Sequence, residues 1–230
     1  MATQGKTLIL TVVRHGQTDA NIQRIIHGWT DTPLNATGLN QAQAAGKALK
    51  GIKFHQAFSS DLQRANKTCQ LILEENQVSN ISPENINQDK LLRERNFGIF
   101  EGDSYDLKLE DRKEDFAPEN GESGIDVKSR ANQFLKSLGK LCEINESIPS
   151  ILIVSHGGLI RRMLSIIFEE LNCSVSANVT NVPDFKESKN ARRYLKNTCF
   201  SRFEVDISNE NFAIKAIRCL ELCNADHLET

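Results

Sequence analysis

The chain has 230 residues, 39% of them hydrophobic and 25% charged, which is enough to bury a full core without disulfide or metal staples. Its formal net charge of −2 argues against a general nucleic-acid-binding surface. No apolar run approaches the roughly 20 residues that span a bilayer. We therefore expect one domain over residues 1–230, with no membrane span and no nucleic acid among its partners.

The six cysteines are scattered and form no Cys-x-x-Cys pair, and the first residues lack the apolar segment of a signal peptide. We therefore expect reduced, buried thiols in a cytoplasmic protein. Cys219, Cys223 and His227 lie close together in the sequence, but no fourth ligand is near them. We therefore predict no metal site.

The first part of the chain alternates strand and helix signals. Leu8–Val13 is short, apolar and β-branched, which predicts a buried parallel strand. Leu39–Leu49 is rich in Ala and Gln and predicts a helix. Gln56–Ser59 predicts a second strand, and Ser60 or Asp61 then caps another helix.

The second part contains the clearest buried strand, Ile151–Val154. The other expectations are a loop with a short strand over 76–91, an irregular helical stretch over 98–121, helices over Glu122–Ile144 and Leu159–Glu170, and antiparallel strands over Phe200–Ile207 and Phe212–Ile217. The polar segment 172–197 has no clear element, and its position after the second strand end suits a lid. The alternation predicts a three-layer α/β/α fold with a mostly parallel sheet.

The two best strands end in a similar way. Arg14, His15 and Gly16 follow the first, and Ser155, His156 and Gly157 follow the later one. Ligands of open α/β sheets bind beyond the carboxyl ends of the strands. If these strands are neighbours, the two imidazoles face each other there. One such histidine is more often structural than catalytic, but two that end buried strands and precede glycine favour a reaction site.

Several further blocks accompany these strand ends in the order Leu10–Thr18 with Asn21, His27–Leu34, Phe58–Ala65, Leu92–Gly98 with Glu101 and Gly102, Val154–Gly158, and Asn197–Thr198. Together they resemble the histidine phosphatase superfamily, which includes the phosphoglycerate mutases. The resemblance extends from about residue 8 to residue 206 and implies a phosphoglycerate-mutase-like α/β fold.

The resemblance implies a metal-independent phosphatase that works through a phosphohistidine. His15 would be the nucleophile. Arg14, Arg64 and His156 would hold the phosphoryl oxygens. Glu94 would protonate the leaving oxygen and then take a proton from the attacking water.

The resemblance also implies a small phosphorylated metabolite as the partner, with no cofactor and no metal. Relatives act on fructose 2,6-bisphosphate and 2,3-bisphosphoglycerate, and the motifs most resemble those of the fructose-2,6-bisphosphatases. Asn21 and Gly157 are expected to support phosphate binding, and Arg24 is a candidate for reading a second phosphate.

Two alternatives stay open. A mutase would return the phosphoryl group to its substrate, although Asn96–Gly102 resembles the phosphatases more than the mutases. A binding module of the same fold would bind a partner without catalysis. The sequence leaves the oligomeric state undetermined.

Overall fold

The computed structural model describes residues 6–105, 113–141, 150–180, 182–185, 194–208, 210–211 and 213–229. Within these ranges the strands are β1 (Lys6–Arg14), β2 (Gln56–Ser59), β3 (Asn87–Gln88), β4 (Ser150–Ser155), β5 (Ser174–Val175), β6 (Phe200–Ile207) and β7 (Ile214–Asn224). They form one seven-stranded sheet in the order β3-β2-β4-β1-β6-β7-β5.

The sheet is mostly parallel, as predicted. β3, β2, β4 and β1 are parallel neighbours, β5 pairs in parallel with β7, and β6 is antiparallel to both β1 and β7. β7 begins at Ile214 and continues to Asn224, well beyond the predicted end at Ile217, because it keeps pairing with β6 through several register shifts. The predicted α/β class is confirmed.

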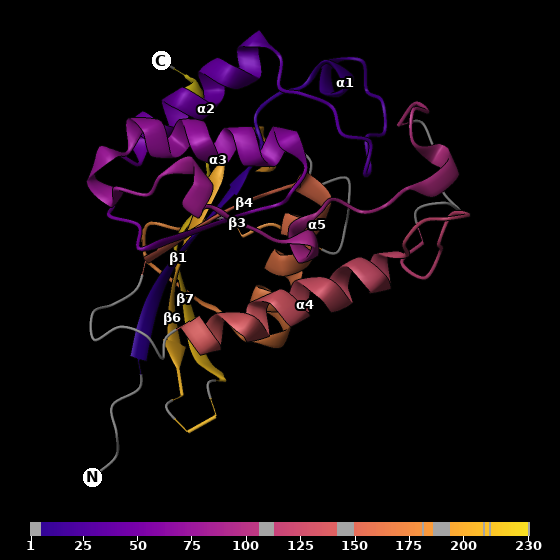
Figure 1. Cartoon of the computed structure of the whole chain (residues 1–230). Helices are drawn as coiled ribbons and strands as arrows, with labels where there is room; N and C mark the ends of the chain where they lie inside the picture. The colour runs from indigo at the N-terminus through magenta and orange to yellow at the C-terminus, as the bar shows by residue number, and fades with distance from the viewer. Residues whose placement is uncertain are drawn as a thin grey trace.

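Helices cover both faces of the sheet (Figure 1). α2 and α3 lie over one face, and α4 and α5 lie over the other. The α-helices are α1 (Asp19–Ile22), α2 (Ala36–Ala48), α3 (Gln63–Glu75), α4 (Gly124–Leu141) and α5 (Gly157–Ser165). Shorter turns are the 3-10 helices η1 (Gln77–Ser79), η2 (Pro83–Asn85), η3 (Lys90–Leu92), η4 (Gly98–Phe100) and η7 (Asp226–Leu228), and the π-helix η6 (Ile166–Glu170).

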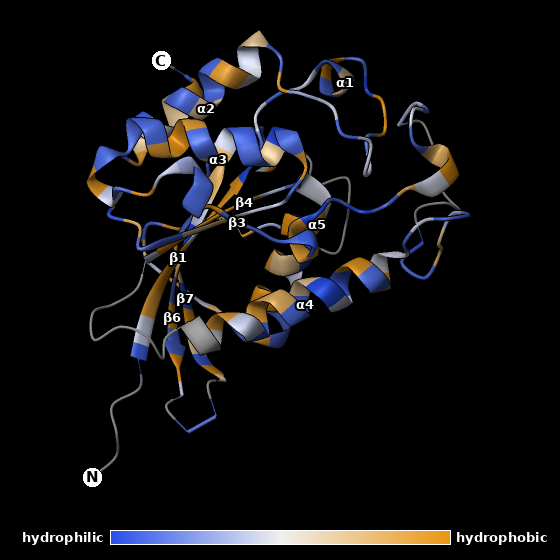
Figure 2. Ribbon diagram, in the orientation of Figure 1, coloured by the Kyte–Doolittle hydropathy of each residue, from blue (hydrophilic) through white to orange (hydrophobic). Residues whose placement is uncertain are grey.

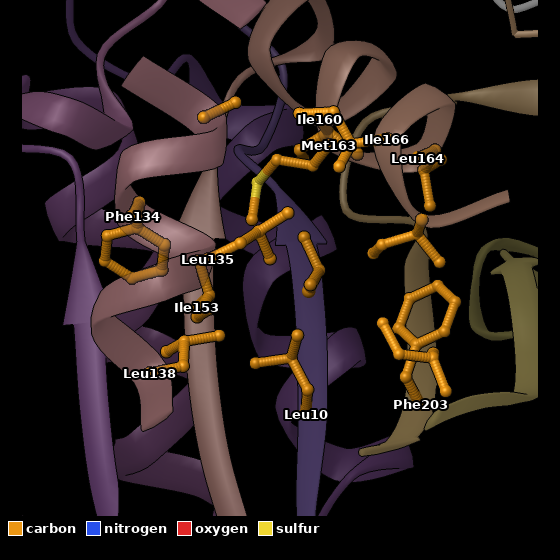
Figure 3. Packing of buried hydrophobic residues seen from close by; sticks show 14 of the residues in the cluster. Leu10, Phe134, Leu135, Leu138, Ile153, Ile160, Met163, Leu164, Ile166 and Phe203 are labelled. Atoms are coloured by element: carbon orange, nitrogen blue, oxygen red, sulfur yellow. The ribbon is translucent and has the colours of Figure 1, made fainter. Parts of the chain in front are cut away.

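Each face of the sheet has its own hydrophobic cluster, because the strands are apolar on both sides. Ile153 of β4 and Leu10 of β1 pack with Phe134 of α4 and Met163 of α5 on one face (Figure 3). Hydrophobic and hydrophilic residues alternate along the helices (Figure 2). No helix in the described ranges is long and apolar enough to cross a membrane.

The predicted cap of the helix after β2 is wrong. α3 begins at Gln63, with Leu62 at the N-cap position and no side-chain cap from it. Asp61 instead pairs with Arg93, with 2.7 Å between Oδ1 and Nε. Asp31, from a loop 32 residues earlier, accepts the first helical N–H from Gln63 at 2.8 Å. A remote carboxylate has replaced the local cap.

The predicted helix over Glu122–Ile144 begins two residues later, at Gly124. Ser123 and Asp126 explain this start, because Asp126 Oδ2 accepts from Ser123 N at 2.9 Å and Ser123 Oγ accepts from Asp126 N at 3.1 Å. Residues 142–149 lie outside the described part, as do 106–112 of the predicted irregular stretch. In 172–197, the described residues add the edge strand β5, and 181 and 186–193 lie outside.

Candidate active site

The two strand-end histidines lie side by side. β1 and β4 are adjacent and parallel, with Arg14 paired to Ser155, so the next residue of each strand is a histidine. His15 N donates to Ser155 O at 2.9 Å, and the ring centroids of His15 and His156 are 5.1 Å apart. Both side chains are buried. The juxtaposition expected from the sequence therefore exists.

The ring of His15 is held in one tautomer. Its Nδ1 lies 2.7 Å from Gly16 O, and since a carbonyl only accepts, Nδ1 carries the proton. Nε2 therefore keeps its lone pair. The main chain of this turn is also fixed, because Gly16 N donates to Thr68 Oγ1 at 3.0 Å and Asn197 Nδ2 donates to His15 O at 2.9 Å.

Burial keeps both histidines neutral. Desolvation, with the charges of Arg64 and Arg14, holds the pKa of His15 well below its ordinary value. Desolvation and Arg64 do the same for the pKa of His156. A neutral imidazole is the nucleophilic form, so the lowered pKa is compatible with the predicted role of His15.

Two arginines surround the histidine pair. Arg64 comes from the first turn of α3 and is almost wholly buried. Its Nη2 donates to Gly28 O at 2.8 Å and its Nη1 donates to Thr30 O at 3.0 Å, which fixes the plane of the guanidinium. Arg14 ends β1 and directs Nη1 to Leu195 O.

Buried nitrogens remain unmatched at this point. Arg14 Nε, Arg64 Nε and both ring nitrogens of His156 are buried without a hydrogen-bond partner among the described residues. Leaving such groups unpaired is costly unless a ligand satisfies them. Two guanidinium N–H donors and an imidazole suit the oxygens of a phosphoryl group.

Gly158 leaves room for the side chain of Glu94. A Cβ on Gly158 would lie 2.1 Å from Glu94 Oε1, which is closer than non-bonded atoms can approach. Glycine at Gly158 is therefore required for the position of Glu94. At Gly157, the first residue of α5, a Cβ would make an ordinary van der Waals contact with Arg14 Nε at 3.4 Å.

Glu94 belongs to residues 91–96, which we call the Glu94 segment. Its Oε2 accepts from Gly158 N at 2.9 Å and its Oε1 accepts from Arg95 N at 2.8 Å. The first bond anchors the Glu94 side chain to the main chain of Gly158, which follows His156 by two residues. Glu94 is also among the charges that act on Arg64. The predicted acid and the predicted phosphate ligands thus converge.

The other predicted phosphate contacts lie further out. Asn21 Oδ1 accepts from Thr18 N at 3.1 Å and from Asn197 Nδ2 at 3.2 Å, so it connects the turn after His15 with the segment before β6. Arg24 occupies an exposed turn with φ 57, and its carbonyl accepts from Tyr105 N at 2.8 Å. Roles for Asn21 and Arg24 in phosphate binding stay predictions.

His27 lies beside the histidine pair, although its block alone did not mark it as a site residue. Its ring meets the His15 ring edge-on, with centroids 6.4 Å apart, and its Nε2 lies 2.6 Å from Thr18 Oγ1. Desolvation, followed by the charges of Arg64 and Arg14, lowers the pKa of His27 to about 4. The signal that it belonged here was its place beside the Gly-Trp turn of a family block.

Glu101 is a second residue whose role the sequence did not reveal. Its Oε2 accepts from Thr30 N and Thr30 Oγ1, both at 2.8 Å, and its Oε1 accepts from Trp29 N at 2.7 Å. The carbonyls of Gly28 and Thr30 in this same turn hold Arg64. Gly28 has φ +53, and its missing Cβ makes way for the Glu101 carboxylate. Glu101 therefore shapes the cradle of Arg64.

Metal-ligand side chains do not cluster in the described ranges. No group of three or more His, Cys, Asp and Glu side chains there is arranged to hold a metal ion. The expectations of no metal and no cofactor stay predictions.

Known proteins match this chain over most of its length. The family described as the histidine phosphatase superfamily (branch 1) matches residues 10–176. Fructose-2,6-bisphosphatase TIGAR B of Danio rerio is 34% identical, covering 97% of both chains. Phosphoglycerate mutase of Schizosaccharomyces pombe is 35% identical over 71% of this chain and 81% of its own. The structure of a phosphoglycerate mutase from Bacillus anthracis superposes with a TM-score of 0.73 at 22% identity, covering 98% and 97% of the two chains.

Proposed function

This chain belongs to the histidine phosphatase superfamily, and from that premise we propose that it is a phosphatase of small phosphorylated metabolites. Membership supports either a phosphatase or a mutase. The finer proposal is hydrolysis through a phosphohistidine on His15, with fructose 2,6-bisphosphate or 2,3-bisphosphoglycerate as substrate, as in a fructose-2,6-bisphosphatase of the TIGAR type. A role in regulating glycolysis and a cytoplasmic location belong to the same proposal.

One observation carries the proposal. His15, with a free Nε2 lone pair, lies 5.1 Å centroid to centroid from His156, among buried nitrogens of Arg14 and Arg64 that have no described partner. This combination provides a nucleophile beside a cluster of donors for an anion. Such a cluster stabilises the charge that spreads over the equatorial oxygens as a phosphoryl group transfers.

In the first proposed step, His15 Nε2 attacks phosphorus in line with the leaving oxygen. The N–P bond forms as the P–O bond breaks, and Glu94 gives its proton to the departing alkoxide. Arg14, Arg64 and His156 would bind the three equatorial oxygens. Neutral His156 already carries one ring N–H, which would donate to one of these oxygens.

In the second step, water replaces the released alcohol. Glu94, now ionised, takes a proton from the water as its oxygen attacks phosphorus, and the N–P bond breaks to return neutral His15 and inorganic phosphate. Every proton is accounted for within the site. Neither step requires a metal ion or a cofactor.

The substrate assignment has separate support. The TIGAR relative covers nearly the whole of both chains, whereas the yeast mutase covers 71% of this one. The proposed cytoplasmic location has support of another kind, because the free thiols of buried Cys69 and Cys199 are compatible with a reducing compartment. A mutase remains the second candidate, because the phosphoglycerate mutase relative is as similar in sequence to this chain as the TIGAR relative, at 35% and 34% identity.

The decisive experiment measures phosphate release in EDTA from fructose 2,6-bisphosphate, 2,3-bisphosphoglycerate and 4-nitrophenyl phosphate, with wild type and His15→Ala. We expect release by wild type, a phosphohistidine on His15, and loss of at least about 10⁴-fold in the variant. Isomerisation of phosphoglycerates without net phosphate release would select the mutase. A wild type that never forms phosphohistidine would leave only a binding module, and release that survives in His15→Ala would exclude the proposed nucleophile.

A further inference from the structure

Arg130 of α4 uses all five of its guanidinium N–H bonds on and around the Glu94 segment. Its Nη1 donates to the carbonyls of Leu91 at 2.9 Å and Arg93 at 2.6 Å, and its Nη2 donates to the Glu94 carbonyl at 2.8 Å. The remaining bonds go to the two carboxylate oxygens of Glu122, at 2.8 Å from Nε and 3.0 Å from Nη2. Because all its N–H groups donate to protein oxygens, Arg130 holds the main chain and has no donor left for a substrate.

The carbonyls of residues 91–94 are all held by side chains. Leu92 O, between two of the Arg130 contacts, accepts from Ser155 Oγ at 2.7 Å. Glu94 O accepts a second bond, from the Trp29 indole Nε1 at 2.7 Å. Past η3 the segment has no strand or helix that would fix its direction. Side chains therefore supply what a hydrogen-bond ladder supplies elsewhere.

Glu122 extends the same support to the other side of Glu94. Its Oε2 accepts from Asn96 N at 2.8 Å, and its carbonyl accepts from Arg95 Nε at 2.7 Å. The main chain is thus fixed by Arg130 up to Glu94 and by Glu122 beyond it. The pair is largely shielded from water, with 11% of the Arg130 side chain and 19% of the Glu122 side chain exposed. Shielding strengthens such charge-assisted bonds.

We propose that Arg130, with Glu122, is the positioning residue that keeps the Glu94 carboxyl at the leaving oxygen of the substrate. The inference rests on the proposed phosphatase function. It makes a specific prediction for the first step, because phosphohistidine formation needs Glu94 only where the departing oxygen needs a proton. A sugar or glycerate alkoxide needs one, whereas 4-nitrophenolate leaves without it.

The experiment compares Arg130→Lys with wild type by the rate of phosphohistidine formation. The two probes are 4-nitrophenyl phosphate and whichever alkyl bisphosphate the wild type hydrolyses faster. Lysine keeps the charge but lacks the planar fork that reaches three carbonyls. We expect a loss of at least about 30-fold with the alkyl probe and less than about threefold with the aryl probe, since general acids contribute roughly 10²–10⁴.

Arg162→Lys is the matched control. Arg162 is also shielded on a helix and forms an ion pair, at 2.6 Å to Glu114 Oε1, a residue outside the Glu94 segment. Its charge acts on Arg95, and lysine preserves that charge. This control should change neither rate by more than roughly threefold. Should Arg130→Lys fail to fold, Glu122→Gln keeps the carbonyl contacts and should show the same selective loss, at about fivefold.

Glu94→Gln completes the test. It should reproduce the alkyl-selective loss, and the double variant with Arg130→Lys should be no slower than Glu94→Gln alone. Equal losses with both probes, or losses that multiply in the double variant, would overturn the inference. If wild type forms phosphohistidine and Arg130→Lys keeps its alkyl rate, only the inference fails. If wild type forms none with any probe, the proposed function fails as well.

Discussion

The nucleophile and the acid of the proposed reaction are held by different kinds of structure. His15 and His156 follow paired residues of adjacent parallel strands, so backbone register sets their positions. Glu94 lies on a segment whose carbonyls are bound by side chains from remote parts of the chain. A strand register changes only if the sheet changes, whereas a side-chain support can be removed by one substitution.

The comparison predicts two signatures. Damage at the strand ends should slow phosphoryl transfer from every substrate, since all share the phosphoryl group. Damage to the supports of the Glu94 segment should slow phosphohistidine formation only from substrates whose leaving group needs a proton. The ratio of alkyl to aryl rates therefore reports which region a substitution affects.

Among substitutions that leave the nucleophile in place, the largest effect is expected for Arg64→Met. The change removes a guanidinium from the phosphoryl side while keeping an unbranched side chain in the buried position. Phosphohistidine formation should fall about 10³-fold, and by the same factor with both probes. Rapid-quench measurement of the phosphoenzyme would check this. A loss confined to the alkyl probe would break the comparison, because Arg64 would then serve the acid.

Acid should lower the free energy of unfolding through the histidines near the strand ends. The native pKa of His27 is about 4 against 6.5 when unfolded, so between these values the unfolded chain binds a proton that the native chain refuses. Its share of the free energy of unfolding is therefore complete above pH 6.5 and declines as the pH falls toward 4. The pKa values of His15 and His156 are also lowered, and they act in the same direction.

His27→Gln isolates this contribution. Between pH 7 and pH 5, the variant should lose about 2 kcal/mol less of its free energy of unfolding than wild type, a factor of roughly 30 in the folding equilibrium. Urea unfolding at both pH values in phosphate-free buffer measures the difference. An identical pH dependence in the two proteins would mean that His27 titrates normally in the native state.

A smaller effect is expected for Glu101→Gln. The amide nitrogen of glutamine would face the N–H groups of Trp29 or Thr30, which loosens the turn whose carbonyls hold Arg64. We expect kcat/KM to fall about tenfold with both probes. Glu221→Gln, which loses an ion pair in the sheet, should change kcat/KM less than about twofold. An alkyl-selective loss would instead assign Glu101 to the acid.

The smallest effect tests a single bond. Trp29→Phe removes the indole N–H that donates to Glu94 O but keeps an aromatic ring beneath Arg93, whose guanidinium carbon lies 4.6 Å from the Trp29 ring centroid. One hydrogen bond of about 1 kcal/mol corresponds to a loss of roughly fivefold, confined to the alkyl probe. The rate of phosphohistidine formation with both probes would detect it. An unchanged ratio would show that Arg130 alone suffices.

The difference between the regions also explains what the sequence could reveal. Apolar runs marked β1 and β4, and the histidine after each predicted their meeting, because chain direction and burial are local properties. Arg130 gave no comparable signal. On an amphipathic helix it looks like any charged residue of the outer face, and the carbonyls that it binds lie 36 to 39 residues away.

The missed residues share this remoteness. Glu101 reaches Trp29 and Thr30 over separations of 72 and 71 residues, and Asp31 caps α3 from 32 residues away. The burial of His27 beside His15 depends on how its turn folds back toward β1. Glu101 and Asp31 satisfy distant backbone groups, and His27 meets a ring 12 residues before it; periodicity and local propensity encode neither.

The reliance of the Glu94 segment on side chains has an evolutionary consequence. A ladder of backbone bonds is indifferent to most substitutions, but a support made by Arg130, Ser155 and Trp29 can drift one residue at a time. Descendants of such a protein can change which alcohol they release while inheriting the phosphoryl chemistry intact. New substrates would then arise through changes in residues that support Glu94 and do not themselves contact the substrate.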